Sequence, residues 1–195
     1  MSEILLQSRE GDIVTLTINR PEKLNAMTKP LWGELGDAMV ALSAQDDVRC
    51  IILRGAGEKA FSPGNDISEF ETQRSNKAQA TEYGHFMHQT VKKIKSCRHP
   101  VVAQIHGICV GGGMEIAALA DMRICGASSR FGAPIKNLGL VMAYDEMEPI
   151  ASLIGSSKAL ELLLEGRIID AQEALRIGLV SRVVPDEQVA AEAFA

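Results

Sequence analysis

The chain alternates short apolar runs with longer amphipathic segments, a pattern typical of an α/β fold. Runs rich in β-branched residues predict strands over residues 13–18, 48–53, 101–105, 121–125 and 180–184. Helical spacing of apolar residues predicts helices over residues 29–44, 72–96, 146–154, 157–165 and 171–177. The order is a repeated ββα or βα arrangement, uninterrupted by a linker, a low-complexity tract or an internal repeat. We therefore expect one domain over residues 1–195.

Composition and charge narrow the possible functions. A chain that is 46% hydrophobic but only 4% aromatic suits an aliphatic α/β core. Its net charge of −5 argues against a nucleic-acid partner. The four cysteines lack paired spacing and the four histidines lack metal-ligand spacing, so we expect a reducing cytoplasm and no metal site. We find neither a signal-peptide pattern nor an apolar run of membrane-spanning length, so we expect no membrane association.

The most informative segment is a buried strand followed by three glycines and the start of a helix. Val101–Ile105 is β-rich, and Gly111, Gly112 and Gly113 stand where the next helix begins. The first N–H groups of a helix have no internal partners, so they can hold a phosphate or a developing oxyanion. The segment lacks the lysine of a nucleotide-triphosphate loop and the third spaced glycine of a dinucleotide fingerprint. The alternative is that the glycines only allow close helix packing.

A second strand-to-helix turn lies earlier in the chain. Pro63-Gly64-Asn65-Asp66 follows the strand predicted over residues 48–53 and precedes a polar helical stretch. Two such turns in one α/β chain could converge on a single ligand.

Several segments, in this order and spacing, give the chain a resemblance to the enoyl-CoA hydratase/isomerase (crotonase) family over nearly its whole length. They are residues 19–27, 61–67, 106–115, 120–123, 131–134, 137–140, 164–171 and 178–184. The resemblance implies a crotonase-like spiral of ββα units that binds an acyl-CoA thioester and polarises its carbonyl. It also implies a homo-oligomer, a trimer or a dimer of trimers. Coenzyme A would enter as part of the substrate, with no separate cofactor.

The resemblance also implies a substrate-binding site. Backbone N–H groups of Asn65 and Gly112 would accept the thioester oxygen, which leaves the Asn65 side chain free to vary. Lys23, with Arg20 and Lys59 as further candidates, could meet the phosphates of coenzyme A; the alternative for each is ordinary surface charge. Residues that would contact coenzyme A or the acyl group are Lys23, Ala26, Ser62, Gly64, Asp66 and Ile67.

Hydratases of this family use two carboxylates, because addition of water across a double bond needs a base and an acid. The first matches Glu115. The second would fall at Ile135, which cannot transfer a proton. Several isomerases of the family carry their acid at the position of Ala143, which is equally inert. Asp145 is a candidate replacement.

Both remaining acids have an alternative explanation. Asp145 and Glu146 could occupy the first turn of a helix, where the helix dipole favours acids. Glu115 could likewise be a first-turn acid, with its pKa lowered by the dipole. Its neighbours Ile108 and Met114 are apolar, however, and desolvation among them would raise its pKa and suit a catalytic role.

Three functions follow. The leading one is an enoyl-CoA hydratase or isomerase that stabilises a thioester enolate. A decarboxylase or thioester hydrolase on the same site would fit Ile135, and a non-catalytic acyl-CoA binding protein is the third. Members of the family continue into a C-terminal helical module that closes the acyl pocket and helps form trimers. The sequence stops at Ala195, so we expect a core without this module, either as a fragment or as a naturally short form; in a fragment, apolar surface meant for those helices would be exposed.

Overall fold

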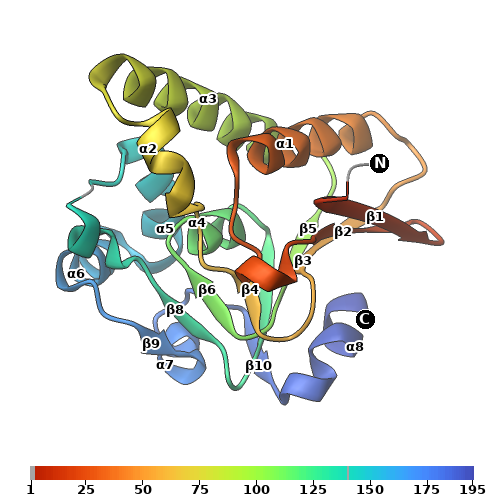
Figure 1. Ribbon diagram of the computed structural model, residues 1–195. Coiled ribbons are helices and arrows are strands. Elements are labelled where there is room, and N and C mark those ends of the chain that lie inside the picture. Colours follow the sequence, from red (N-terminus) through yellow and green to blue (C-terminus); the bar gives the residue numbers. More distant parts are fainter. Residues whose placement is uncertain (1–2, 140) are drawn as a thin grey trace.

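The computed structural model describes residues 3–139 and 141–195, which build two sheets surrounded by helices (Figure 1). The larger sheet has the strand order β1-β2-β3-β5-β7-β10. Strand β1 pairs antiparallel with β2, and every other pair in this sheet is parallel. Its strands are β1 (Leu5–Glu10), β2 (Ile13–Ile18), β3 (Cys50–Gly55), β5 (Val101–Ile105), β7 (Met122–Gly126) and β10 (Arg182–Val184).

A smaller sheet has the order β4-β6-β8-β9, with β9 antiparallel to β8. Three of its strands each follow a strand of the larger sheet directly along the chain, so that the path steps between the sheets at β3–β4, β5–β6 and β7–β8. This stepping, with a helical segment after each pair, is the ββα spiral that the sequence predicts. The strands are β4 (Ala60–Ser62), β6 (Ile108–Val110), β8 (Arg130–Gly132) and β9 (Ile169–Asp170).

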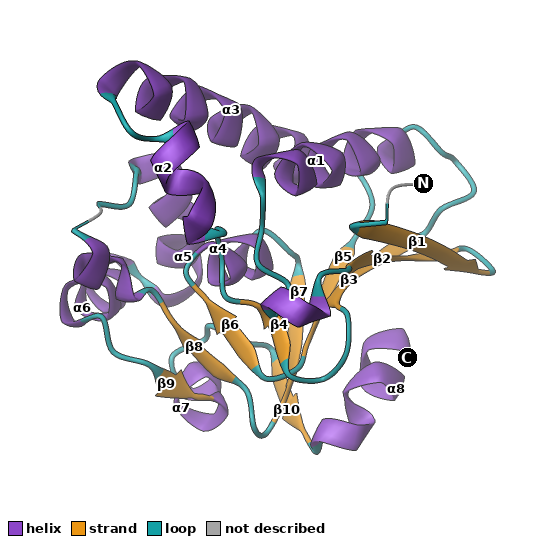
Figure 2. Ribbon diagram, in the orientation of Figure 1, coloured by secondary structure: helices purple, strands orange, loops and turns teal. Residues whose placement is uncertain are grey.

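Helices cover the sheets, and α1 and α3 lie side by side above the strands in Figure 2. The α-helices are α1 (Lys29–Ser43), α2 (Phe70–Gln73), α3 (Lys77–Lys95), α4 (Gly112–Ala118), α5 (Tyr144–Ile154), α6 (Ser156–Glu165), α7 (Ala171–Arg176) and α8 (Val189–Phe194). Short 3-10 turns are η1 (Pro21–Lys23), η2 (Ile67–Glu69), η3 (Pro134–Leu138) and η4 (Asp186–Gln188). Within the described ranges, none of the helices is both long and apolar enough to cross a lipid bilayer.

Helix α1 packs against α3 and contacts β1 of the larger sheet. The Thr28 side chain accepts a hydrogen bond from the Leu31 N–H and caps the helix, and Pro30 in its first turn has no N–H to leave unpaired. Leu31, Leu35 and other apolar residues at helical spacing form its buried face. Trp32 on this face is fully buried.

The sequence-based expectations hold best for long, periodic segments. The strands expected over residues 13–18 and 101–105 match β2 and β5. The helical region expected over residues 72–96 is instead two helices, because the Asn76 side chain accepts from the Gln79 N–H at 3.0 Å and caps a new helix. The sequence pattern does not predict the three-residue strands β4, β6 and β8, since so few residues carry no readable period.

Two helical glycines give opposite expectations for substitution by alanine. A Cβ atom at Gly113 would lie 2.1 Å from the Ser62 carbonyl oxygen, whereas one at Gly84 would meet nothing within 4 Å. We expect Gly113→Ala to lower the free energy of unfolding by about 1–3 kcal/mol, because backbone of α4 and β4 must separate. Gly84→Ala should raise it by about 0.5–1 kcal/mol, as for any exposed helical glycine. Urea unfolding measures both; equal effects would contradict the close packing of α4 on β4.

Candidate functional site

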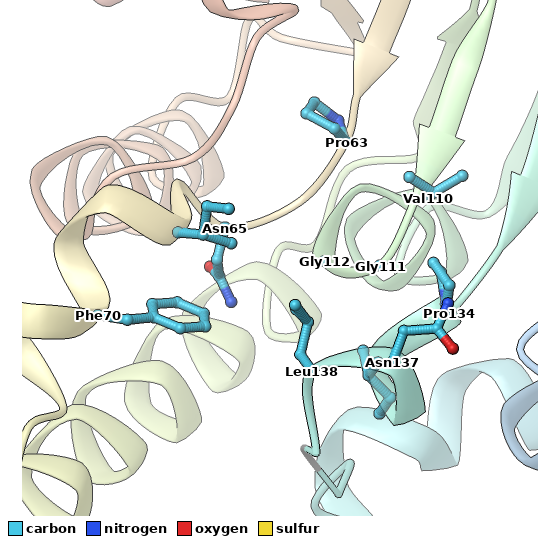
Figure 3. A pocket seen from close by; sticks show the side chains of 11 residues that line it. Pro63, Asn65, Phe70, Val110, Gly111, Gly112, Pro134, Asn137 and Leu138 are labelled. Carbon is cyan, nitrogen blue, oxygen red and sulfur yellow. The ribbon is translucent and has the colours of Figure 1, made fainter.

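A cavity of about 260 Å³ lies where three segments meet (Figure 3). Its walls come from the turn after β4, the end of β6 with the start of α4, and the turn η3. Most lining side chains are apolar, and the polar ones are Asn65 and Asn137. The cavity is therefore suited to an apolar group that carries few polar atoms.

The two strand-to-helix turns singled out in the sequence are in direct contact here. Gly64 has φ +94°, and a Cβ atom on it would lie 2.6 Å from the Gly112 nitrogen. A Cβ atom on Gly112 would lie 3.6 Å from the Asn65 nitrogen. Among the described residues, neither the Asn65 N–H nor the Gly112 N–H has a hydrogen-bond acceptor. Two free donors thus lie next to each other at the cavity wall.

The turn that carries Asn65 is fixed on both sides by hydrogen bonds. The Met27 N–H donates to the Gly64 carbonyl and the Asp66 N–H donates to the Met27 carbonyl, both at 2.8 Å. The Ser62 hydroxyl is fully buried; it accepts from the Gly64 N–H at 3.1 Å and donates to the Asn25 carbonyl at 2.8 Å. The backbone around Gly64 is therefore ordered before any ligand arrives.

An ion pair ties this turn to the segment before α1. Arg20 lies 3.0 Å from Asp66, and both side chains are largely buried. Hydrogen bonds from Ser68, followed by the bond and charge of Arg20, lower the pKa of Asp66. Arg20 also donates to the carbonyl of the buried Ala26 at 2.6 Å. The Arg20 charge is thus already compensated.

Lys23 and Ile67 are exposed beside this region, Ile67 to 61%. They are placed where a large ligand could reach them. Contacts of these residues, and of Ser62, Gly64, Ala26 and Asp66, with coenzyme A remain predictions.

Glu115 is the acid that the fold buries. It is 3% exposed, and its Oε1 atom is buried without a hydrogen-bond partner in the described structure. Burial raises its pKa well above the ordinary value, the nearby Glu146 charge adds to the rise, and Arg74 opposes it. Desolvation is therefore the largest cause of the shift, as expected from the apolar neighbours of Glu115.

Neither acid lines the cavity: Glu115 lies in α4, three residues after the lining residue Gly112, and Asp145 lies on another element. Asp145 lies in the first turn of α5, in a separate depression with His85 and His88. Its carboxylate is 2.6 Å from His88 Nδ1 and the side chain is 64% exposed. Ile135 lines the cavity, and Ala143 is the N-cap of α5. Leu140, the last residue of the segment 137–140 used for the resemblance, lies outside the described residues.

One part of the site was missed by sequence reasoning. The Trp32 indole N–H donates to Asn65 Oδ1 at 2.7 Å, and the Tyr83 hydroxyl lies 3.5 Å from the same oxygen. The Arg74 guanidinium stacks over the Tyr83 ring, 3.8 Å from its centroid. The Asn65 side chain is thus anchored by two buried aromatic residues. No sequence spacing links positions 32, 65 and 83, so only the folded chain reveals this cluster.

The fold is a ββα spiral, and comparisons with known proteins identify its family. The sequence profile described as "Enoyl-CoA hydratase/isomerase" matches residues 8–195. The short-chain-enoyl-CoA hydratase of Clostridium acetobutylicum is 33% identical over 97% of this chain and 71% of its own length. The crotonyl-CoA hydratase of Syntrophomonas wolfei is 33% identical over 97% and 72%, respectively.

A solved structure is closely similar as well. The crystal structure of an enoyl-CoA hydratase/carnithine racemase from Magnetospirillum magneticum superimposes with a TM-score of 0.96 at 45% identity. It covers all of this chain, which in turn covers 73% of that protein. The chain therefore belongs to the enoyl-CoA hydratase/isomerase family. It is an enzyme of that family and spans somewhat more than two thirds of the length of these relatives.

The buried Glu115 makes a prediction about stability and pH. Its pKa is raised above 4.5 in the folded chain, so above pH 4.5 the folded state binds more protons at this group than the unfolded state. This contribution lowers stability as pH rises, until pH passes the raised pKa. Glu115→Gln cannot ionise, so we expect its free energy of unfolding, relative to the unaltered chain, to increase from pH 4.5 upward in urea titrations.

Glu148→Gln is the control for this measurement. A hydrogen bond from Lys95 lowers the pKa of the exposed Glu148, so both states are ionised above pH 4.5 and Glu148→Gln should give a small difference that does not change with pH over this range; its stabilising contribution is lost only as pH falls below 4.5. A pH-independent difference for Glu115→Gln would show that Glu115 is not buried in the way described.

Proposed function

We propose that this chain forms an enolate from an acyl-CoA thioester, with the thioester oxygen held by the N–H groups of Asn65 and Gly112. The observation that carries the proposal is the contact of two strand-to-helix turns, which leaves two unpaired donors side by side at an apolar cavity. Donors fixed in this way stabilise the negative charge that develops on oxygen, and each contributes about 10²–10³-fold in rate. They need no reorganisation during the reaction.

Glu115 is the proposed proton carrier. Burial raises the pKa of Glu115, and a carboxylate with a raised pKa is a stronger base than an exposed one. Glu115 would take the proton from the α-carbon while the electron pair moves onto the thioester oxygen. It would then return the proton to the same enolate or its extended form.

Of the two reactions in the family's description, isomerisation of a 3-enoyl to a 2-enoyl thioester needs fewer groups. One carboxylate can remove the proton from C2 and return it to C4, whereas hydration also requires a positioned water. The apolar Ile135 at the cavity supports this preference. Hydration remains within reach of Glu115 alone if the same carboxylate both activates water and protonates the α-carbon. Because the relatives described above are named hydratases, the experiment below also tests hydration.

Ile135 also favours a second candidate, decarboxylation of a malonyl-type thioester. The carbon–carbon bond to the carboxylate breaks, its electron pair forms the enolate, and carbon dioxide leaves. No base is needed, and a protonated Glu115 would supply the proton to the α-carbon. An apolar wall disfavours the charged carboxylate and so favours its loss as neutral carbon dioxide.

The remaining features of the proposal concern substrate and assembly. Coenzyme A is part of the substrate, and no separate cofactor is needed for enolate chemistry. Lys23, Ala26, Ser62, Gly64, Asp66 and Ile67 form the proposed contact region for coenzyme A. We also propose that the chain forms a homo-oligomer, either a trimer or a dimer of trimers, and that it is located in the cytoplasm.

Product analysis by mass spectrometry tests the reaction. The unaltered chain is incubated with a 3-enoyl-CoA, crotonyl-CoA or methylmalonyl-CoA. We expect isomerised 3-enoyl-CoA as the main product, and a loss of about 10²–10⁴-fold in kcat/KM for Glu115→Gln. Asp145→Asn should keep the activity, because Asp145 pairs with His88 outside the cavity.

Other outcomes reject parts of the proposal. Carbon dioxide from methylmalonyl-CoA alone would select decarboxylation. Loss of activity in Asp145→Asn would make Asp145 the missing carboxylate. Thioester binding without any product would indicate a binding protein.

A further inference from the structure

The carboxamide of Asn65 has its oxygen and its nitrogen in different surroundings. The oxygen accepts from the Trp32 indole N–H at 2.7 Å, with the Tyr83 hydroxyl 3.5 Å away. An indole N–H can only donate, so the atom that faces it must be the oxygen, and this fixes the orientation of the amide. Trp32 is fully buried and Tyr83 is 2% exposed, which holds the amide in place.

The nitrogen is left to face the cavity. Figure 3 shows Nδ2 of Asn65 turned toward the space between Phe70 and Leu138. Among the described residues no acceptor pairs with Nδ2. The surrounding walls, with Ile135 among them, are mostly apolar. An oriented N–H donor thus projects into an otherwise apolar space, beside the two backbone N–H groups of Asn65 and Gly112.

We propose that the Asn65 side chain is a specificity residue, which selects acyl-CoA thioesters whose acyl group carries a second acceptor oxygen close to the thioester carbonyl. A 3-oxo group or a carboxylate on the acyl chain has such an oxygen. Trp32 acts as a positioning residue, because it holds the amide with Nδ2 toward the ligand. This inference rests on the proposed function in one respect, namely that the thioester carbonyl lies at Asn65 and Gly112.

The physical reason is the cost of covering a donor that finds no acceptor. When a hydrocarbon acyl group displaces water from Nδ2, the N–H loses its hydrogen bond and gains none. A ligand with an oxygen in that place restores the bond. Sites built around a fixed polar group reject analogues that lack the matching atom more strongly than apolar pockets discriminate by size.

Calorimetric binding of two thioesters of similar shape tests the proposal. Acetoacetyl-CoA carries a 3-oxo oxygen, and isovaleryl-CoA carries a methyl group in its place. We expect the unaltered chain to bind acetoacetyl-CoA about 10- to 100-fold more tightly. Asn65→Ala keeps the backbone N–H but should bring the ratio of the two Kd values close to one, by weakening acetoacetyl-CoA alone.

Three further variants separate specificity from structure. Asn65→Asp can still accept from Trp32 but presents an acceptor to the cavity, so the preference should reverse toward isovaleryl-CoA. Trp32→Phe releases the amide and should lower the ratio although Asn65 remains. Asn137→Ala is the matched control, since this second asparagine lines the same cavity without an anchored amide, and it should keep the ratio. Circular dichroism checks that each variant folds.

Specific results overturn the proposal. A ratio near one in the unaltered chain, a ratio unchanged in Asn65→Ala, or equal weakening of both thioesters in Asn65→Ala would each do so. Absence of binding by either thioester would overturn both this proposal and the proposed function. Normal binding ratios without turnover would count against the proposed function alone, because the ratio is measured without catalysis.

Discussion

The contact between the backbones of Gly64 and Gly112 is the constraint on which the site depends. A side chain at Gly64 would collide with the Gly112 nitrogen, so only glycine, at its positive φ, lets the two turns approach. The pairing of β4 with β6 brings the turns to this position, and Gly113 continues the contact onto the Ser62 carbonyl. The smaller sheet, though built of very short strands, therefore sets the spacing of the two free N–H groups.

Sequence reasoning recovered the parts of this arrangement that leave a local signature. Glycines after an apolar strand mark a strand-to-helix turn, and the turns at Gly64 and Gly112 are both where they were predicted. It also identified the apolar surroundings that raise the pKa of Glu115. It could not find β4, β6 and β8, because three residues are too few to show a period. Nor could it pair Trp32 with Asn65, which only the packing of α1 brings together.

The approach of the two turns also explains why Trp32 is placed where it is. A Cβ atom on Gly112 would lie 3.2 Å from the Trp32 ring, so the indole packs under the same glycine whose N–H faces the cavity. Its N–H then reaches the Asn65 amide. One buried aromatic residue from α1 thus touches both turns, with its ring against one and its polar atom on the other. Helix α1 is part of the site although no residue of α1 lines the cavity.

The charge of Glu115 depends on segments beyond its own helix. Burial in α4 favours the neutral acid, and the Glu146 charge at the start of α5 acts in the same direction. The opposing charge is Arg74, which stands at the break between α2 and α3 and is held over the Tyr83 ring. That break exists because Asn76 caps and starts α3. The Asn76 cap, which lies outside the site, therefore helps to place Arg74, whose charge opposes the rise in the pKa of Glu115. This balance of burial and two charges sets the direction in which the pKa of Glu115 is shifted.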